Sequence, residues 1–476
     1  MQYFVPLLDY PSGQPVVAPI EGEAFATQLL EGLQAERDAL DELAFRASDA
    51  TAQRGPVEAD RAAQDRGDVR AAGWTYVIHA DDPQREAIID ALEPLARYRG
   101  MAAPREPLRF DGRPADQWGD WLEASYPTIA GKQRPQYFML VGDPQRLPFE
   151  FQWFLSLVAS VGRVDFAAPA DYRAYADKLL RLEREPAGVT RREAVFFAPD
   201  GGPRDPTFYS RRYMAAPLAK YADEQLGFRT HTLFGEDAHR EGLAATLQAT
   251  RPAIVYSASH GFSAFRQPED VQRRINGAIQ CQNDDGSRVA DDFIYGAAQV
   301  PEDGPFLEGA VFFQFACLGY GTPAESYFAP WLPKLRVASP TADFVAALPR
   351  RLVLHPQGPI AFIGHVDLAF LQGFTDADGP DIRNPWHPRL DPFTKALKQL
   401  LMVQPVGLAL ESMSQRAADR SASIANRVGQ FMRRRIADSA EFRSDLAQRF
   451  VELGDARNYL LFGDPGARLR TAASRD

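Results

Sequence analysis

The chain has 476 residues, of which 45% are hydrophobic and 24% are charged. This composition is typical of a folded globular protein and excludes global disorder. The length exceeds what one hydrophobic core usually supports, so we expect two subdomains. The formal net charge of −10 disfavours a nucleic-acid partner, because proteins that bind nucleic acids usually present a basic surface.

The first residues, "MQYFVPLLDYPSGQPVV", lack the basic stretch followed by a continuous apolar run that marks an export signal. The sequence contains no run of about 18 apolar residues, so we expect no membrane-spanning helix. Two cysteines are too few for a disulfide framework in a chain of this length. We therefore expect a cytoplasmic protein with no membrane contact, in which each thiol is judged on its own surroundings.

The first part of the chain is predicted to hold an extension and one α/β subdomain. Residues 1–70 form the extension, which is partly helical and then polar. Strands alternate with helices over residues 71–188, which form the subdomain. The expected elements are a strand at 74–80, helices at 81–100 and 115–126, and a strand ended by a turn at 136–143. A Pro- and Arg-containing segment at 181–193 marks the boundary.

The alternation restarts over residues 189–476, the second predicted subdomain. Its expected elements are strands at 194–200 and 228–234, helices at 208–227 and 239–250, and a strand that opens at 253. Two apolar runs broken by glycine follow at 309–321 and 358–370, and a long, mostly helical region closes the chain. The fold class is therefore α/β, with mostly parallel sheets flanked by helices in two side-by-side subdomains. The recurrence of "LVGDP" at 140–144 as "LFGDP" at 461–465 suggests two related half-sheets.

His260 and Cys317 each come directly after an apolar strand, in "IVYSASHG" and "FFQFAC". Ligands of open parallel sheets gather beyond the carboxyl ends of the strands. The separation of 317 − 260 = 57 residues leaves room for a crossover and an excursion, so neighbouring strands can bring the two side chains together. We predict that they do.

A thiol and an imidazole at such an edge can cleave an acyl bond. The thiolate is the nucleophile, and histidine carries or releases a proton near neutral pH. Gly261 permits close backbone approach, and its N–H is free to bind developing negative charge. Taken singly, a His-Gly pair after a strand is more often a turn, and an Ala-Cys pair is as often a small buried hydrophobe. Their order and their positions at two strand ends favour the chemical interpretation.

The other cysteine and histidines give weaker signals. Cys281 lies in "GAIQCQNDDGSRVADDF", which predicts a strand, a tight Asp-Gly turn and a helix opening at residue 290 or 291. His365 ends another apolar strand and is a candidate for substrate contact, although a satisfied polar residue is the plainer interpretation. The remaining histidines show no metal-ligand spacing, and no phosphate-binding glycine loop is present, so we expect neither a metal nor a cofactor.

With these residues in hand, the chain resembles the caspase-like (clan CD) cysteine peptidases, most closely their gingipain-type branch. The likeness covers about residues 74–470 and keeps histidine before cysteine. Besides the two segments above, it is carried by "YFMLVGDPQRLP", "GPIAFIG", "QPVGLALESM" and "NYLLFGDP". The segment around Cys281 is similar to a hairpin-then-helix insert of the related CHAT branch.

The resemblance implies a caspase–haemoglobinase fold whose catalytic subdomain is the second one, residues 189–476. It implies that Cys317 is the nucleophile, that His260 is the general acid, and that the backbone N–H groups of Gly261 and Cys317 form the oxyanion hole. Gln314 and His365 are further candidates for substrate contact. The expected substrates are proteins.

The segment "PFEFQWF" stands where basic-specific members of the gingipain branch place an acidic residue of the S1 pocket. Phe151 or a neighbour occupies that place, and Glu150 is a candidate acidic substitute that would favour a basic P1 residue. A solvated turn carboxylate is the competing interpretation of Glu150.

The leading hypothesis is an intracellular cysteine endopeptidase, held as a zymogen until an upstream protease or regulatory partner activates it. Segments 181–193 and 265–277 are candidate places for such control, and 265–277 could equally be a lid or a surface connection. The alternative is a caspase-like scaffold or regulatory protein without turnover. A hydrolase or transferase on a Rossmann-like sheet is weaker, because no nucleotide fingerprint is present.

Overall fold

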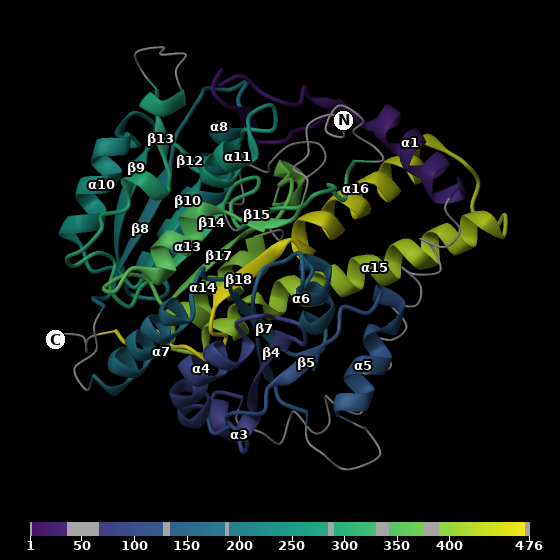
Figure 1. Cartoon of the computed structure of the whole chain (residues 1–476). Coiled ribbons are helices and arrows are strands. Elements are labelled where there is room, and N and C mark those ends of the chain that lie inside the picture. The colour runs from purple at the N-terminus through teal and green to yellow at the C-terminus, as the bar shows by residue number, and fades with distance from the viewer. Residues whose placement is uncertain are drawn as a thin grey trace.

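The computed structural model describes residues 2–35, 66–126, 134–185, 190–283, 290–329, 342–374 and 390–471. Figure 1 shows helices packed around a long sheet that runs through the molecule. This is the predicted α/β class, with a mostly parallel sheet flanked by helices. None of the helices in these ranges is long and apolar enough to cross a bilayer.

Within the described residues, ten strands form the main sheet, and every neighbouring pair is parallel except β17–β18. The two halves on either side of that pair therefore run in opposite directions. In spatial order the strands are β5 (Leu108–Phe110), β4 (Trp74–His79), β6 (Tyr137–Val141), β7 (Ser160–Val164), β18 (Tyr459–Gly463), β17 (Ala361–His365), β14 (Val311–Phe315), β10 (Ile254–Ala258), β8 (Glu193–Ala198) and β9 (Arg229–Phe234).

The helices pack in groups that contact one another. In one group α4 packs on α7 and α7 on α13; in another, α14 contacts α9 and α15, and α15 packs along α16, which also carries α1. The bounds are α1 Gly22–Ala35, α3 Val69–Ala72, α4 Arg85–Tyr98, α5 Trp118–Ser125, α6 Phe149–Ser156, α7 Pro169–Arg184, α8 Pro206–Ser210, α9 Ala216–Glu224, α10 Arg240–Ala249, α11 Glu269–Ile275, α13 Ala347–Leu354, α14 Asp391–Leu401, α15 Glu411–Met432 and α16 Ala440–Arg457.

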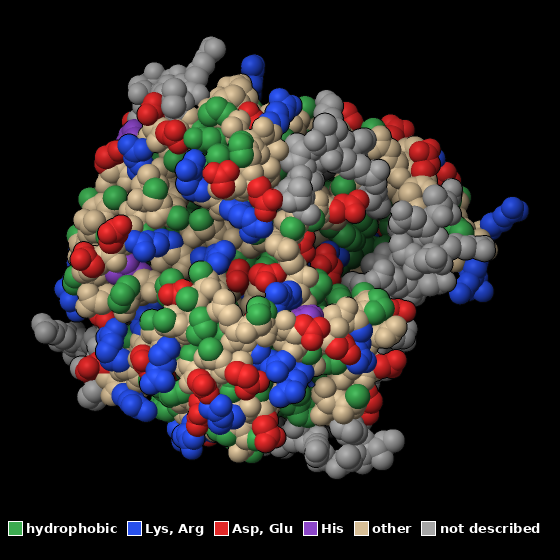
Figure 2. Space-filling model, viewed as in Figure 1, with side chains coloured by type: hydrophobic (Ala, Val, Ile, Leu, Met, Phe, Trp, Pro, Cys, Tyr) green, Lys and Arg blue, Asp and Glu red, His purple; other side chains and the backbone are tan. Residues whose placement is uncertain are grey.

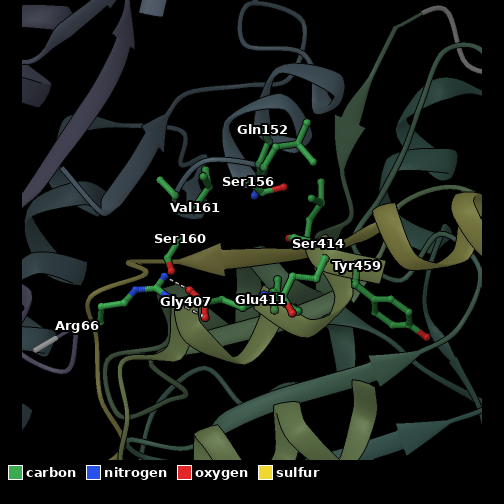
Figure 3. A pocket seen from close by; sticks show the side chains of 14 residues that line it. Arg66, Gln152, Ser156, Ser160, Val161, Gly407, Glu411, Ser414 and Tyr459 are labelled. Atoms are coloured by element: carbon green, nitrogen blue, oxygen red, sulfur yellow. Dashed lines mark hydrogen bonds and ion pairs between the residues drawn. The ribbon is translucent and has the colours of Figure 1, made fainter. Parts of the chain in front are cut away.

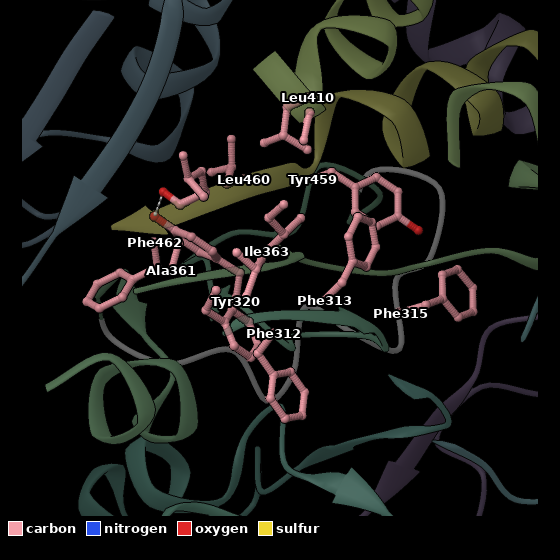
Figure 4. Packing of buried hydrophobic residues seen from close by; sticks show 14 of the residues in the cluster. Phe312, Phe313, Phe315, Tyr320, Ala361, Ile363, Leu410, Tyr459, Leu460 and Phe462 are labelled. Atoms are coloured by element: carbon pink, nitrogen blue, oxygen red, sulfur yellow. Dashed lines mark hydrogen bonds between the residues drawn. The ribbon is translucent and has the colours of Figure 1, made fainter. Parts of the chain in front are cut away.

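The middle of the sheet is buried on both faces, as expected for strands between two helical layers. Figure 4 shows aromatic rings of β14 and β18 packed with Ala361 and Ile363 of β17. Phe312 stacks on Phe362 with ring centroids 5.5 Å apart, and Phe313 meets Tyr459 at 5.7 Å. Such rings contribute much of a core's burial energy, so this packing holds the antiparallel seam between the two halves.

A smaller sheet combines three strands from the excursion between β10 and β14 with one strand from the start of the chain. Its order is β13 (Ile294–Tyr295), β12 (Ile279–Gln280), β11 (Gly261–Ser263) and β2 (Leu7–Asp9). The strands β11, β12 and β13 are antiparallel neighbours, whereas β2 pairs parallel with β11. The extension at the start of the chain is therefore bound to the second half of the molecule. Within this extension, β1 (Gln2–Tyr3) pairs with β3 (Ile20–Glu21) in a two-stranded sheet.

The predicted strands agree with the structure where apolar runs are unbroken, and the prediction misses two strands of the main sheet, β5 and β7. Arg163 interrupts the apolar pattern of β7, yet its side chain is fully buried. It donates to Gln152 Oε1 at 3.0 Å and to the carbonyl of Gly142 at 2.9 Å, and it also contacts the carbonyl oxygens of Leu147 and Pro148. A buried guanidinium satisfied in this way is compatible with a central strand, which the pattern alone did not indicate.

Several other predictions are refined by the structure. The Asp-Gly turn of the Cys281 segment lies outside the described residues, and from residue 290 only a short 3₁₀ turn, Ala290–Asp292, is present rather than a longer helix. Segment 265–277 contains the helix α11. The helix α7 continues to Arg184 at the expected boundary, and residues 186–189 lie outside the described part of the chain.

Candidate active site

The strands that precede His260 and Cys317 are direct neighbours. β10 and β14 pair parallel and in register, from Ile254 opposite Val311 to Ala258 opposite Phe315. His260 lies two residues beyond Ala258, and Cys317 lies two residues beyond Phe315. The register therefore brings the two positions to the same point on the carboxyl edge of the sheet.

Gly261 allows the two strand tips to touch. A Cβ atom built on this residue would lie 1.8 Å from the carbonyl oxygen of Cys317 and 3.0 Å from its nitrogen. Backbone atoms cannot move aside cheaply for a side chain at such distances. The glycine after the histidine is thus needed for packing, because any larger residue would separate the tip that carries His260 from the tip that carries Cys317.

A third strand tip contributes a carboxylate to the site. Asp205 follows β8, the neighbour of β10 on its other side, and caps the start of α8. Both of its carboxylate oxygens lie 3.0 Å from Nε2 of His260. A carboxylate only accepts, so Nε2 carries a hydrogen. His260 is 1% exposed, and its Nδ1 has no hydrogen-bond partner among the described residues. The anchored ring can therefore present Nδ1 to a reactant.

The carboxyl group of Asp205 strongly favours its ionised form. Burial alone would raise the pKa of this carboxyl, but the neighbouring His260 and the hydrogen bonds from Thr207 outweigh it and lower the pKa to about 2. The Thr207 backbone N–H donates at 2.8 Å and the Thr207 hydroxyl at 2.5 Å. Asp205 thus remains an anion at all ordinary pH values and can stabilise a protonated imidazole.

Cys317 is buried and turned toward a different strand tip. Its side chain is 0% exposed, its Sγ accepts the N–H of Ala369 at 3.3 Å, and the thiol lies 3.7 Å from the carbonyl oxygen of Ala369. Burial raises the pKa of the Cys317 thiol well above its ordinary value, which disfavours the thiolate. In this conformation the sulfur is bound to Ala369, while the His260 ring is bound to Asp205.

The predicted oxyanion donor Gly261 already binds a carbonyl group. Its N–H donates to the carbonyl oxygen of Pro6 at 3.0 Å. Pro6 immediately precedes β2, so the start of the chain lies directly against the tip that carries His260. A carbonyl oxygen is the group that an oxyanion hole would receive from a substrate.

Gln314 and His365 point into the structure rather than toward an open surface. Gln314 on β14 is fully buried and donates from Nε2 to the carbonyl of Gly277 at 2.8 Å. His365 ends β17 and is also fully buried, with Nε2 3.1 Å from the carbonyl oxygen of Asp455. The contacts of both side chains are internal, so substrate contact by either would require them to be released.

Glu150 lines a small pocket beside the cysteine loop. It lies in the first turn of α6, half-buried, and shares the pocket with Glu325, Asp367 and Arg457. The Asp367 carbonyl accepts the N–H of Leu318, the residue after Cys317, at 2.8 Å. Nearby, burial and then the charge of Glu150 raise the pKa of Asp343 to about 6. The pocket is therefore acidic along one side, while Arg457 covers another by stacking on Tyr327, 3.9 Å from the ring centroid.

A second pocket lies elsewhere, at the seam between β7 and β18. Figure 3 shows the ion pair of Arg66 and Glu411 next to Ser160, with Gln152 and Ser156 further along the same pocket. Neither His260 nor Cys317 lines it. Cys281 does not line this pocket either. It is buried, and burial raises its thiol pKa, while the N–H of the neighbouring Gln280 donates to the carbonyl of His260 at 3.3 Å. Within the described ranges, no group of three or more His, Cys, Asp or Glu residues could hold a metal ion.

Asp205 is the residue that the sequence interpretation missed. The available signal was an Asp-Pro pair at 205–206 that opens a helix, shortly after the predicted strand at 194–200. Asp before Pro at a helix start is the usual sign of an N-cap, and this ordinary role hides the second one. Only the adjacency of β8 and β10 places the same carboxylate on His260.

The solved structures that resemble this chain include the following three distant neighbours. The complex of Porphyromonas gingivalis RgpB pro- and mature domains is 13% identical with a TM-score of 0.49, covering 84% of this chain and 80% of that one. A structure described as "Structure of Protease" is 11% identical with a TM-score of 0.47, covering 84% and 79%. The Saccharomyces cerevisiae separase–securin complex gives 12% and 0.35, covering 73% of this chain and 17% of the other.

No family model and no curated protein sequence matches the chain. At these identities and TM-scores, the three neighbours carry no argument about activity. The case for a site at this edge of the sheet therefore depends on the residues and contacts described above.

Asp205→Asn tests the role of the carboxylate. The amide keeps the helix cap, because Asn is as good an N-cap as Asp, but it removes the charge that stabilises a protonated His260. If the chain is an active peptidase, turnover should fall by about 10²–10⁴-fold, the size of a general acid–base contribution. Turnover of the two proteins measured on one peptide tests this, and unchanged turnover would contradict the role.

Thermal unfolding measured against pH tests whether the negative charge of Asp205, and not only its packing, stabilises the folded protein. Because the folded pKa of Asp205 lies below its unfolded value, its stabilising contribution is present above about pH 4 and is lost as pH falls toward 2. The difference in Tm between the wild-type protein and the Asn variant should therefore narrow over that interval. Asp205→Ala is the matched control, and loss of the cap should cost about 1 kcal/mol more than the Asn variant.

Proposed function

We propose that the chain is a caspase-like cysteine endopeptidase that cleaves proteins with Cys317 as nucleophile and His260 as general acid. The observation that carries the proposal is the contact between the His260–Gly261 tip and the Cys317 tip, on neighbouring parallel strands. The carboxylate of Asp205 on Nε2 of His260 supports it further, because it leaves Nδ1 free for the reaction. The fold class and the order of the two residues along the chain agree with the resemblance to this peptidase class.

In the proposed reaction, the thiol of Cys317 passes its proton to Nδ1 of His260, and the sulfur attacks the carbonyl carbon of the scissile peptide. The N–H groups of Gly261 and Cys317 would stabilise the oxyanion, and loss of one such donor typically lowers turnover by about 10²–10³-fold. The C–N bond then breaks, and the amine leaves with the proton from Nδ1 of His260. A water molecule next hydrolyses the thioester, which releases the acid product and the thiol. Asp205 is a positioning residue that keeps the ring oriented by accepting the hydrogen on Nε2.

The described conformation corresponds to a latent form of such an enzyme. Attack requires the sulfur of Cys317 to leave Ala369, and it requires Gly261 to exchange the Pro6 carbonyl for that of a substrate. Activation by an upstream protease or a regulatory partner would supply this change. Segments 181–193 and 265–277 remain the proposed places for cleavage, and α11 in the second of them presents exposed residues such as Glu269 and Arg274.

Cys317→Ala provides the first test. The change removes the sulfur from a buried position and leaves the backbone intact, so the variant should fold while losing peptide cleavage to below about 10⁻³ of the wild-type rate. Labelling of the activated protein by a peptidyl electrophile should disappear with it. Cys281→Ala is the matched control and should keep both signals. Cleavage that persists in Cys317→Ala would exclude Cys317 as the nucleophile.

We propose that the pocket beside Glu150 receives a basic P1 side chain. The pocket is lined by Glu150, Glu325 and Asp367, and the backbone carbonyl of Asp367 accepts the N–H of Leu318, the residue that follows Cys317. A peptide library should then show preferred cleavage after Arg or Lys, and Glu150→Gln should lower kcat/KM for these peptides about tenfold with little change for neutral P1 residues. Glu106→Gln, on a distant loop, is a charge-matched control. Equal losses for basic and neutral P1 residues would contradict the assignment.

We place the protein in the cytoplasm, because both cysteines are free and a reducing compartment keeps them so. Its proposed partners are protein substrates and an activating protease or regulator, with neither nucleic acid nor membrane. On the face shown in Figure 2, Lys and Arg side chains are interspersed with Asp and Glu, which agrees with the absence of a basic footprint on that face.

The second candidate is a caspase-like scaffold or regulatory protein without turnover. The observation that favours it is the fully buried thiol of Cys317, which is bound to Ala369 and has a raised pKa. Under that alternative, no activating treatment would expose the thiol to a peptidyl electrophile, and the protein would instead form a stable complex with its partner.

A further inference from the structure

We propose that residues 3–10 are an internal ligand of the candidate site, which they close by occupying the place of an extended substrate strand. Calling this place a substrate site rests on the proposed function. The claim that residues 3–10 close the site does not depend on it. In Figure 1 the start of the chain, in purple, crosses the molecule beside α8 and α11 and so lies far from α3, the next described helix after α1. The segment that it forms, residues 3–10, is called the N-terminal strap below.

The strap is bound as a strand on the element that carries the site. β2 pairs parallel with β11, which begins at Gly261, and the register sets Leu7 opposite Gly261 and Asp9 opposite Ser263. β2 is the edge strand of its sheet. An edge position of this kind can be filled by any extended peptide, since the hydrogen bonds come from the backbone. The strap therefore occupies an exchangeable place, one residue from His260.

The strap also binds the opposite wall of the site. The carbonyl of Phe4 accepts the N–H of Leu371 at 3.3 Å, and the N–H of Phe4 donates to Oε1 of Gln372 at 3.4 Å. These residues follow Ala369, which holds the sulfur of Cys317. The ring of Phe4 stacks on Tyr209 of α8, the helix capped by Asp205, with centroids 6.4 Å apart. One short segment thus spans the three elements that hold His260, Cys317 and Asp205.

The contact with Gly261 resembles a bound but uncut substrate. The carbonyl oxygen of Pro6 accepts the Gly261 N–H at 3.0 Å, as a scissile carbonyl would in the proposed oxyanion hole. The sulfur of Cys317 is meanwhile hydrogen-bonded to Ala369. The strap can therefore occupy the Gly261 N–H without being cleaved, because the sulfur of Cys317 is not directed at the Pro6 carbonyl.

The strap is itself buried at the site. Tyr3, Val5, Leu7 and Leu8 are each no more than 5% exposed, and His260 and Cys317 are 1% and 0% exposed. The chain that follows is different, because Pro11, Ser12, Gln14, Pro15, Ala18 and Pro19 are exposed. A tightly docked segment followed by an accessible connection is a suitable arrangement for release by a single cut or by a competing partner.

The test is a chain that can be cut after folding. A recognition sequence for a site-specific protease is inserted between the exposed residues Ala18 and Pro19, and the folded protein is cut and freed of residues 1–18 by gel filtration. Alkylation of Cys317 by iodoacetamide is followed by peptide mapping, which distinguishes it from Cys281. Release of the strap should speed Cys317 alkylation by about tenfold or more, because access limits the reaction of a buried thiol.

A synthetic peptide of residues 1–18 added back should restore the slow rate, and the same peptide with Leu7→Asp and Leu8→Asp should not. If the cut fragment stays bound, the same two substitutions are made in the cuttable chain, so that the strap is released by loss of its buried contacts. A Cys317 alkylation rate equal to that of the uncut protein after the strap has been removed would overturn the proposal.

The outcomes separate this inference from the proposed function. Fast alkylation together with peptide cleavage supports both. Fast alkylation of Cys317 without cleavage of any member of a peptide library supports the strap and contradicts the peptidase. Peptide cleavage by the uncut protein at the rate of the cut one contradicts the strap and leaves the peptidase in place.

Discussion

The in-register parallel pairing of β10 and β14 is the constraint on which the rest of the site depends. Because Ala258 lies opposite Phe315, residues two positions further along each strand meet at the same point of the sheet edge. Gly261 then packs directly on the backbone of Cys317, at a separation that excludes any side chain. A slip of one residue in this register would reverse the faces of a strand that is buried on both sides, so the surrounding core enforces it.

The thiol and the imidazole at this edge of the sheet differ in how ready they are to react. A nucleophilic thiol needs access and a stabilised thiolate, whereas Cys317 is buried and has a raised pKa. The imidazole, in contrast, is already held by Asp205 with Nδ1 unpartnered among the described residues. The acid side of the proposed chemistry is thus assembled while the nucleophile is withheld. The proposed N-terminal strap lies against both sides of the site, since it occupies the Gly261 N–H and binds Leu371, two residues beyond Ala369.

The sequence predicted the strands that end at His260 and Cys317, because unbroken apolar runs followed by glycine mark buried parallel strands and their ends. Asp205 escaped because it lies 55 residues from His260 and is also an ordinary helix cap. β7 escaped because Arg163 breaks the apolar pattern, and its burial depends on carbonyl groups supplied by other elements. The sulfur of Cys317 is bound by Ala369, 52 residues away, and the neighbouring Gly261 pairs with β2 at the start of the chain. Periodicity within one segment carries no information about such contacts.

The most direct measurement is a crystal structure of the activated protein after reaction with a peptidyl electrophile. The proposed mechanism predicts a covalent bond to the sulfur of Cys317, turned away from Ala369, with the inhibitor's oxygen on the N–H of Gly261 in place of Pro6. It also predicts that His260 keeps Nε2 on Asp205 while Nδ1 faces the leaving-group side. An adduct on Cys281 alone, or a modified Cys317 whose bound peptide lies away from His260, would contradict it.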